Sequence, residues 1–227
     1  MPQNADRTKT RRQHDSLFAQ HDPLRVRYAR SELICQEGSY AAGMYVIESG
    51  LVSESMPPPI SSDNKPYKIL GPGELIGVEI LLLGDSERHI TSCRALVDTE
   101  LSFVERSSFM SALEADAQLC RFVLGSVSAK SFALASSLCR SGSAPAERLC
   151  ALLLELADAH GERSECGDTT LPHAITRNLL CALASLSSSQ LKAAWDALPS
   201  LREKPECGGI AVSARELAGW QQARRPS

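Results

Sequence analysis

The chain has 227 residues, of which 43% are hydrophobic and 22% charged, and its formal net charge at pH 7 is −3. This length allows two small domains that each bury a core, and the composition excludes a disordered chain. The first thirty residues are mostly polar and contain no apolar segment long enough for secretion or for a membrane span. We therefore expect a cytoplasmic protein with no membrane partner.

Short strands are predicted after a polar arm that covers residues 1–20. Apolar or alternating runs lie at residues 33–34, 45–47, 51–52, 69–70, 90–91 and 101–104. Turn signals such as Glu37-Gly38 and Ser49-Gly50 separate these runs. Many short strands with glycine at their corners predict a β-roll or barrel over residues 21–114. The proline-rich residues 56–66 predict a long exposed loop, because proline cannot donate a ladder hydrogen bond.

A longer repeat replaces the alternating pattern from about residue 115. Six residues follow one another at spacings of 4, 3, 4, 3 and 4, namely Cys120, Leu124, Val127, Ser131, Leu134 and Leu138. This is the spacing of an a/d seam along one helix, predicted over residues 115–141. The alternative is a helix that packs only on its own β-roll. A parallel homodimer is the preferred interpretation, because each buried Leu or Val contributes about 1.5–3 kcal/mol.

The C-terminal part, residues 145–227, has the pattern of a small helical domain. Residues 146–159 predict a helix that ends before Gly161. Residues 175–198 predict two short helices joined by a tight turn, with Leu179, Leu180 and Leu183, then Leu191, Trp195 and Leu198, facing the core. Ser187 is the predicted N-cap of the second helix, and the pair predicts a helix-turn-helix. Residues 206–212 predict a two-stranded wing with Gly208-Gly209 at or near its turn.

Four segments carry a family resemblance: residues 31–38, 44–53, 73–79 and 175–198, the last beginning with Ile175-Thr176-Arg177. Together they resemble the Crp/Fnr family of bacterial transcription regulators. The resemblance implies an α+β fold, with a β-roll like a cyclic nucleotide-binding domain, a long dimerisation helix and a C-terminal winged helix-turn-helix. It implies a homodimer that binds a pseudo-palindromic site in double-stranded DNA, and it suggests RNA polymerase as a further partner.

The resemblance also places a candidate effector pocket. In the cyclic-nucleotide branch of the family, a glycine followed by glutamate holds the ribose, and an arginine-serine pair eleven residues after the glycine holds the cyclic phosphate. This chain keeps Gly77 and Arg88 at that separation but has Val78 for the glutamate and His89 for the serine, and Glu79 comes one residue late. Because two of four polar contacts are lost, we expect a regulator that does not depend on cyclic AMP.

The predicted recognition helix lacks the family's base readers. Ser188, Ser189 and Ala193 stand where the family usually has arginine, glutamate and arginine, and Ser185 replaces the glycine of its turn. Serine and alanine cannot reproduce the pairing of arginine with guanine or of glutamate with cytosine. The remaining DNA-binding candidates are Thr176, Arg177, Ser188, Ser189, Gln190 and Lys192.

The charge of the C-terminal domain leaves an alternative function open. Residues 145–227 contain nine Lys/Arg and ten Asp/Glu, whereas most DNA-binding modules are basic. The alternative is a sensor or protein-interaction module whose helix-turn-helix no longer reads DNA. An enzyme is not expected, because the sequence shows no nucleophile and base constellation, no P-loop and no His/carboxylate metal motif; the prediction includes no catalytic residue and no metal.

Eight cysteines occupy positions 35, 93, 120, 139, 150, 166, 181 and 207, and no two lie within four residues. This spacing lacks the short-loop pair typical of zinc and iron–sulfur sites. We interpret them as free thiols in a reducing compartment, several of them in the core. Some family members bind haem, but no spacing among His89, Cys93, Met44 and Pro2 identifies an axial pair. No cofactor is predicted.

Overall fold

The computed structural model describes residues 23–56, 65–83, 88–164, 168–199, 201–204 and 209–223. The predicted arm and most of the predicted proline-rich loop lie outside these residues. The chain forms two compact units, residues 1–133 and 134–227. Their boundary falls inside the long helix α4 (Ala117–Arg140), whereas the sequence analysis places domain boundaries before and after that helix.

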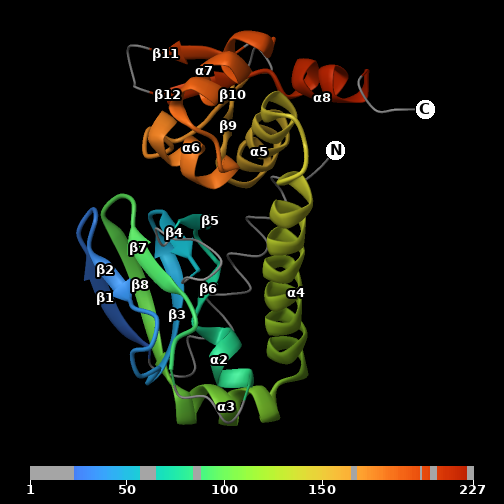
Figure 1. Cartoon of the computed structure of the whole chain (residues 1–227). Coiled ribbons are helices and arrows are strands. Elements are labelled where there is room, and N and C mark those ends of the chain that lie inside the picture. The colour runs from blue at the N-terminus through green and yellow to red at the C-terminus, as the bar shows by residue number, and fades with distance from the viewer. Residues whose placement is uncertain are drawn as a thin grey trace. The chain divides into compact units, whose positions relative to one another are not determined.

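Among the described residues, eight short strands build the β-roll of the first unit (Figure 1). They are β1 (Leu24–Tyr28), β2 (Leu33–Cys35), β3 (Gly43–Ser49), β4 (Val52–Ser55), β5 (Pro66–Leu70), β6 (Leu75–Ile76), β7 (Ser92–Ala95) and β8 (Thr99–Glu105). They form two antiparallel sheets of order β1-β8-β3-β6 and β2-β7-β4-β5. Side chains from both sheets meet in one apolar core, made of Ile34, Cys35, Ile47, Val52, Leu70, Ile76, Cys93, Ala95 and Leu101. The predicted fold class is confirmed.

Two details of the roll differ from the sequence prediction. Strands β1 and β6 have no counterpart among the predicted runs, and the run at residues 90–91 precedes β7 instead of forming it. Pairing of β7 with β4 begins only at Ser92, opposite Ser55, and Ile90 is exposed. The predicted turn at Gly50 is present. Its φ is 98°, and a Cβ there would collide with Thr99, so this turn requires glycine.

Three helices close one side of the roll: α2 (Val78–Leu82), α3 (Arg106–Ala115) and α4. They share a second apolar core, which contains Met44, Val46, Leu75, Val78, Leu81, Phe109, Leu119 and Val123. Helix α4 begins at residue 117 because Asp116 is extended and ends α3. The Asp116 carboxylate accepts hydrogen bonds from the amides of Gln118 and Leu119, at 2.7 and 3.2 Å, and so acts as the N-terminal cap of α4.

In its described residues, the second unit combines four helices that follow α4 with a four-stranded sheet. The elements after α4 are α5 (Pro145–His160), β9 (Glu162–Arg163), β10 (Thr169–Thr170), α6 (Arg177–Ala184), α7 (Ser188–Ala197), β11 (Arg202–Lys204), β12 (Gly209–Val212) and α8 (Ala214–Gln222). The sheet order is β11-β12-β10-β9, and α5 packs against α6, α7 and α8. Gly209 pairs with Lys204 inside the wing, so Gly209 belongs to β12, while Gly208 lies outside the described residues.

The helix-turn-helix follows the predicted pattern closely. Leu180, Leu183, Leu191 and Leu198 are buried, and Leu179 and Trp195 are half-buried. Ser187 caps α7, because its Oγ accepts a 3.2 Å hydrogen bond from the amide of Gln190. Ser185 ends α6 at φ 51° and ψ 49°. It therefore adopts the left-handed conformation for which glycine is the usual residue.

We expect Ser185→Gly to raise the free energy of unfolding by up to about 1 kcal/mol, because the left-handed strain of a Cβ exceeds the extra backbone entropy that glycine loses. Urea unfolding followed by circular dichroism measures this change. Ser185→Ala is the matched control, since it keeps the Cβ and should not stabilise the protein. A Ser185→Gly protein that is less stable than wild type would contradict the strain argument.

Candidate effector pocket and nucleic-acid interface

A buried ionic cluster lies between the β-roll and α4. The Lys130 ammonium lies 2.5 Å from Glu79 Oε1 and 3.3 Å from Glu54 Oε1. Lys130 comes from α4, Glu54 from β4 and Glu79 from α2. The side chains of Lys130 and Glu54 are 6% and 1% exposed. The Thr91 hydroxyl donates to Glu54 Oε1 at 3.1 Å, so the cluster joins three elements of the first unit.

The surroundings of the cluster favour its charged form. Burial by itself lowers the pKa of the Lys130 ammonium, but the Glu54 and Glu79 carboxylates outweigh burial and hold that pKa above its ordinary value. Burial, followed by the neighbouring Glu54 carboxylate, raises the pKa of Tyr67. Tyr67 therefore stays neutral, and its hydroxyl can donate a hydrogen bond to the Glu54 carboxylate. Taking these charges out of water is costly, so the cluster persists only because its members are paired.

The predicted effector-pocket residues separate into inward and outward positions. Glu79 lies on α2 and reaches the cluster, while Val78 is fully buried in the apolar core. Gly77 has a φ of 78°, and a Cβ there would lie 2.9 Å from Cε1 of the buried His89, so glycine makes room for the histidine. Arg88 is exposed and donates to the carbonyl oxygen of Gly38 at 2.7 Å. The structure thus brings Gly77, Glu79 and His89 inside and leaves Arg88 outside.

Sequence reasoning missed Glu54 and Lys130. Lys130 has a visible signal, because it is the one charged residue between Arg121 and Arg140 in an otherwise apolar or small-residue stretch. An isolated lysine in such a stretch needs a partner if it is buried. Glu54 gives no comparable signal, since an acid in an alternating strand normally reads as solvent-facing. Together with Glu79, the two residues give the cluster a formal net charge of −1.

Three polar residues of the helix-turn-helix cap helix ends, namely Thr176, Ser187 and Gln190. Thr176 caps α6 by accepting from the amide of Leu179 at 3.3 Å. The Gln190 side chain bends back, and its Oε1 accepts from the amide of Ser187 at 3.0 Å, which completes a capping box. Gln190 is therefore committed to the helix end and cannot present both amide atoms to an adenine. Ser188, Ser189 and Lys192 are exposed on α7.

The helix-turn-helix carries two cations, Arg177 and Lys192. The Arg177 guanidinium lies over the Trp195 ring, 4.5 Å from its centroid, a distance typical of a cation–π contact. Lys192 is on the same helix as Trp195, one turn earlier. Asp196 is the second charged residue of α7 and is exposed as well. Helix α7 itself is therefore neutral.

The comparisons with known proteins agree with this architecture. Residues 25–116 match the family model of the cyclic nucleotide-binding domain. FixK2 from Bradyrhizobium japonicum is 19% identical, with a TM-score of 0.71 and coverage of 87% of this chain and 96% of that chain. The chain has the Crp/Fnr-type fold, and the predicted family resemblance is confirmed at that level. No curated protein sequence matches the chain.

Two further solved structures cover most of the chain. The transcriptional regulator TTHA1359 of the CRP/FNR family, from Thermus thermophilus, is 19% identical with a TM-score of 0.66, covering 89% of this chain and 100% of that chain. The c-di-GMP responsive global regulator CLP from Xanthomonas campestris is 20% identical with a TM-score of 0.69, covering 87% and 96%. At these identities the likeness concerns the fold.

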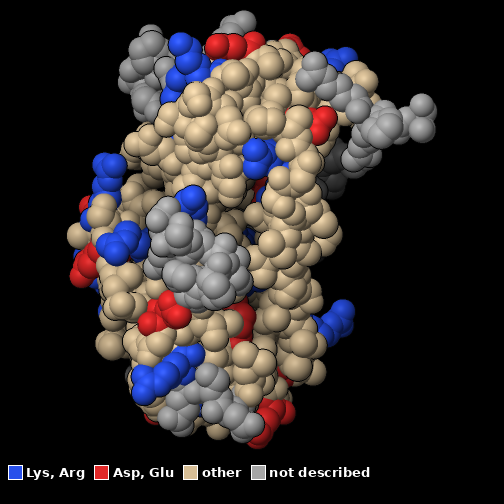
Figure 2. Space-filling view, in the orientation of Figure 1, with Lys and Arg blue, Asp and Glu red and all other residues tan. Residues whose placement is uncertain are grey.

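Helix α4 of this Crp/Fnr-type fold leaves its predicted seam largely uncovered. Leu119, Val123 and Lys130 are its buried residues. Among the seam positions, Leu124 and Leu138 are exposed to 57% and 59%, Ser131 is exposed, Cys120 and Leu134 are half-buried, and Val127 packs against the core. Phe132, outside the predicted seam, is also exposed. Figure 2 shows the α4 side of this view as mostly uncharged surface.

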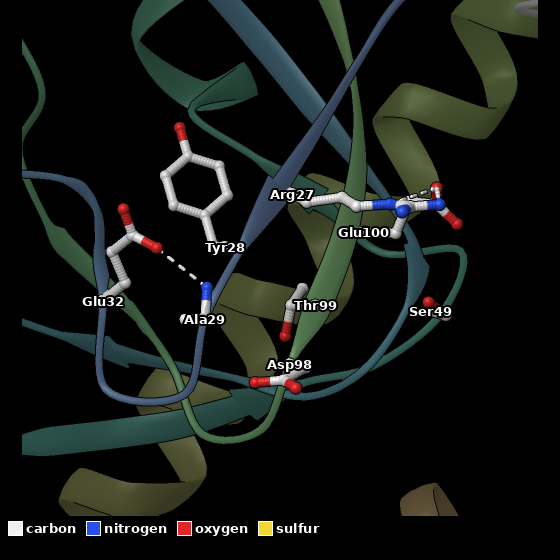
Figure 3. A pocket seen from close by; sticks show the side chains of 8 residues that line it. All are labelled: Arg27, Tyr28, Ala29, Glu32, Ser49, Asp98, Thr99 and Glu100. Atoms are coloured by element: carbon white, nitrogen blue, oxygen red, sulfur yellow. Dashed lines mark hydrogen bonds and ion pairs between the residues drawn. The ribbon is translucent and has the colours of Figure 1, made fainter.

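A surface hollow of about 610 Å³ lies at one end of the roll, lined by Arg27, Tyr28, Ala29, Glu32, Ser49, Asp98, Thr99 and Glu100 (Figure 3). Its carboxylates already have partners. Glu32 accepts from the amide of Ala29 at 2.8 Å, Asp98 accepts from the amide of Arg30 at 2.9 Å, and Arg27 pairs with Glu100 at 3.2 Å. These bonds fasten turns and strand ends, so the hollow is a structural feature of the roll.

We expect Lys130→Met to lower the free energy of unfolding by about 3–5 kcal/mol, because it leaves two carboxylates buried without their cation. Chemical unfolding followed by circular dichroism measures the loss. Arg121→Met is the matched control on the same helix. It removes an exposed cation and should change stability by less than about 0.5 kcal/mol. Equal stability of the two variants would contradict the cluster.

Proposed function

We propose that the protein is a homodimeric, DNA-binding transcription regulator of the Crp/Fnr type whose activity does not depend on cyclic AMP. The observation that carries the proposal is the succession of a cyclic nucleotide-binding-like roll, a long helix with an uncovered apolar face, and a winged helix-turn-helix. Solved Crp/Fnr-type regulators share this fold over most of their length. A cytoplasmic location fits such a regulator, and RNA polymerase stays a predicted partner.

The exposed face of α4 supports a second copy of the chain as its occupant. Among the described helices, α4 alone is long and apolar enough to cross a membrane by length and composition. Its buried face, however, packs on the β-roll through Leu119, Val123 and Lys130. The remaining apolar stripe through Leu124 and Leu138 has the heptad spacing of a two-helix seam. In the proposed dimer, α4 of the second copy packs against this stripe, and a twofold axis relates the two helices.

We expect Leu124→Asp to raise the dissociation constant of the dimer by roughly 10²- to 10⁴-fold, because two leucines are lost per dimer at about 1.5–3 kcal/mol each. Sedimentation velocity measures the change. Leu124 suits this test better than Leu134, which is half-buried, because a charge at an exposed site does not disturb the monomer. Ala129→Asp is the matched control on another exposed side of α4 and should stay dimeric. A dimeric Leu124→Asp protein would contradict the seam.

The buried cluster supports independence from cyclic AMP. A cyclic phosphate needs a cation, but Lys130 is already paired with two carboxylates, and Arg88 is bound outside to Gly38. The formal net charge of −1 in the cluster also disfavours an anionic ligand nearby. In the proposed regulator the Glu54 and Glu79 carboxylates therefore neutralise Lys130, so that Lys130 is not available to a nucleotide phosphate.

We expect saturating cyclic AMP to leave the affinity of the protein for duplex DNA unchanged within twofold. Fluorescence anisotropy of a labelled duplex, with and without the nucleotide, measures this. A tenfold or larger change in affinity would show that the roll still takes the nucleotide and would contradict the role given to Lys130.

The DNA-binding surface proposed here relies on phosphate contacts more than on base readers. Arg177 and Lys192 supply cations, and Ser188 and Ser189 supply hydroxyls that can contact a base edge or a phosphate. Gln190 contributes to the helix cap instead. Such a surface predicts modest sequence selectivity per half-site, with selectivity gained from the spacing of two half-sites about one helical turn apart.

We expect Lys192→Ala to weaken binding to all duplex sequences alike and to reduce the slope of log affinity against log salt by about 1. Filter binding at several salt concentrations measures both. Arg25→Ala removes an exposed cation from β1 and is the control, with no change expected. A Lys192→Ala protein with wild-type affinity and slope would remove α7 from the DNA interface.

One observation favours a second function. Helix α7 contains one lysine and one aspartate as its charged residues, and the usual arginine readers are absent. A sensor or protein-interaction module that kept the winged fold without reading DNA fits that surface. The two functions differ in one property, which is whether the protein prefers some duplex sequences to others.

A further inference from the structure

Two buried cysteines face each other inside the β-roll. Cys35 on β2 and Cys93 on β7 are directly opposed across an antiparallel pair, beside a register shift that separates Leu33 from Cys35. Directly opposed residues have Cα atoms about 4.5–5.5 Å apart, which lies within the range that a disulfide spans. Cys35 is 7% exposed and Cys93 is fully buried. Both are free thiols.

The surroundings of this pair activate Cys35. A hydrogen bond from the Cys93 thiol, opposed by burial and aided by His89, lowers the pKa of Cys35 below its ordinary value. The same bond raises the pKa of Cys93. His89 is held in place by its backbone, which donates to the Ser39 carbonyl at 2.9 Å and accepts from the Gly38 amide at 2.8 Å. Cys35 is thus the nucleophilic thiolate, and Cys93 is its protonated neighbour.

We propose that Cys35 and Cys93 form a hydroperoxide-reactive dithiol site that closes to a cross-strand disulfide. The Cys35 thiolate attacks one peroxide oxygen, the O–O bond breaks, and hydroxide leaves to take up a proton as water. Cys35 is now a sulfenic acid. The Cys93 sulfur then attacks the Cys35 sulfur, and the S–O bond breaks. The departing hydroxide takes the Cys93 proton. Two thiols lose two electrons, and one hydrogen peroxide becomes two waters.

The order of events follows from exposure and access. Cys35 is the more exposed of the two residues and carries the stabilised thiolate, so a small oxidant meets Cys35 first. Cys93 lies behind it as the resolving thiol. Three residues lie side by side on neighbouring strands, because Cys93 is directly opposed to Cys35 on one side and to Glu54 on β4 on the other. The reactive pair therefore adjoins the ionic cluster that holds α4.

The test uses the reduced full-length protein with one equivalent of hydrogen peroxide. Free thiols are then alkylated under denaturing conditions and mapped by peptide mass spectrometry. We expect two of the eight cysteines to become unavailable and a Cys35–Cys93 linked peptide to appear and to vanish on reduction. Alkylated Cys35 and Cys93 alongside an oxidised Cys139, which is exposed, would overturn the proposal without the need for any variant.

Variants assign the two roles. In Cys93→Ser a 1,3-diketone probe should trap the sulfenic acid at Cys35, and in Cys35→Ser the probe should not label Cys93. Cys139→Ser is the matched control and should still form the linked peptide at the wild-type rate. Labelling of Cys93 in the Cys35→Ser protein would reverse the proposed order and refute the role of Cys35 as the attacking thiolate.

Discussion

The ion pairs of Lys130 with Glu54 and Glu79 fix helix α4 against the β-roll. A buried ammonium tolerates no rotation of its helix, because any turn away from the carboxylates leaves three charges unpaired at a cost of several kcal/mol. With Lys130 facing inward beside Leu119 and Val123, Leu124 must face outward. One buried lysine thus determines which side of α4 is available to another molecule, and the proposed dimer depends on that choice.

The same cluster supports the proposed independence from cyclic AMP. In a cyclic nucleotide-binding domain the interior must offer a cation to a phosphate, whereas here the interior cation is already neutralised by two acids. Glu54 joins the cluster from the middle of a strand, and its neighbours along the row are Cys93 and Cys35. The apolar interior of the roll therefore has a charged cluster on its α4 side.

Sequence reasoning was most reliable where the signal is local. Turn glycines and alternating runs located most strands of the roll, and Ser187 was recognised as a helix cap because capping depends on residues three apart. The break at Asp116 is also local, but the sequence analysis does not predict it. The heptad pattern favours one helix over residues 115–141 and gives no sign of a cap at residue 116. Long-range pairings could not be predicted. Glu79 lies one residue after the position of the family's ribose-binding glutamate. Its ion pair with Lys130 follows from its place on α2, which the sequence does not reveal.

The DNA surface shows the same division between local and long-range information. The absence of the usual readers was visible in the sequence, but the commitment of Gln190 to the cap of α7 and the stacking of Arg177 on Trp195 were not. In the proposed function the remaining cations are Arg177 and Lys192, and selectivity comes from the pairing of two copies. The proposed function therefore requires that the full-length protein distinguish between DNA sequences.

The most direct measurement is selection of the full-length protein on a pool of random duplex DNA, with sequencing of the bound fraction at two salt concentrations. A sequence-specific homodimer predicts enrichment of a motif with twofold symmetry and half-sites about one helical turn apart, persisting at the higher salt. Binding that enriches no motif and disappears as salt rises would contradict it.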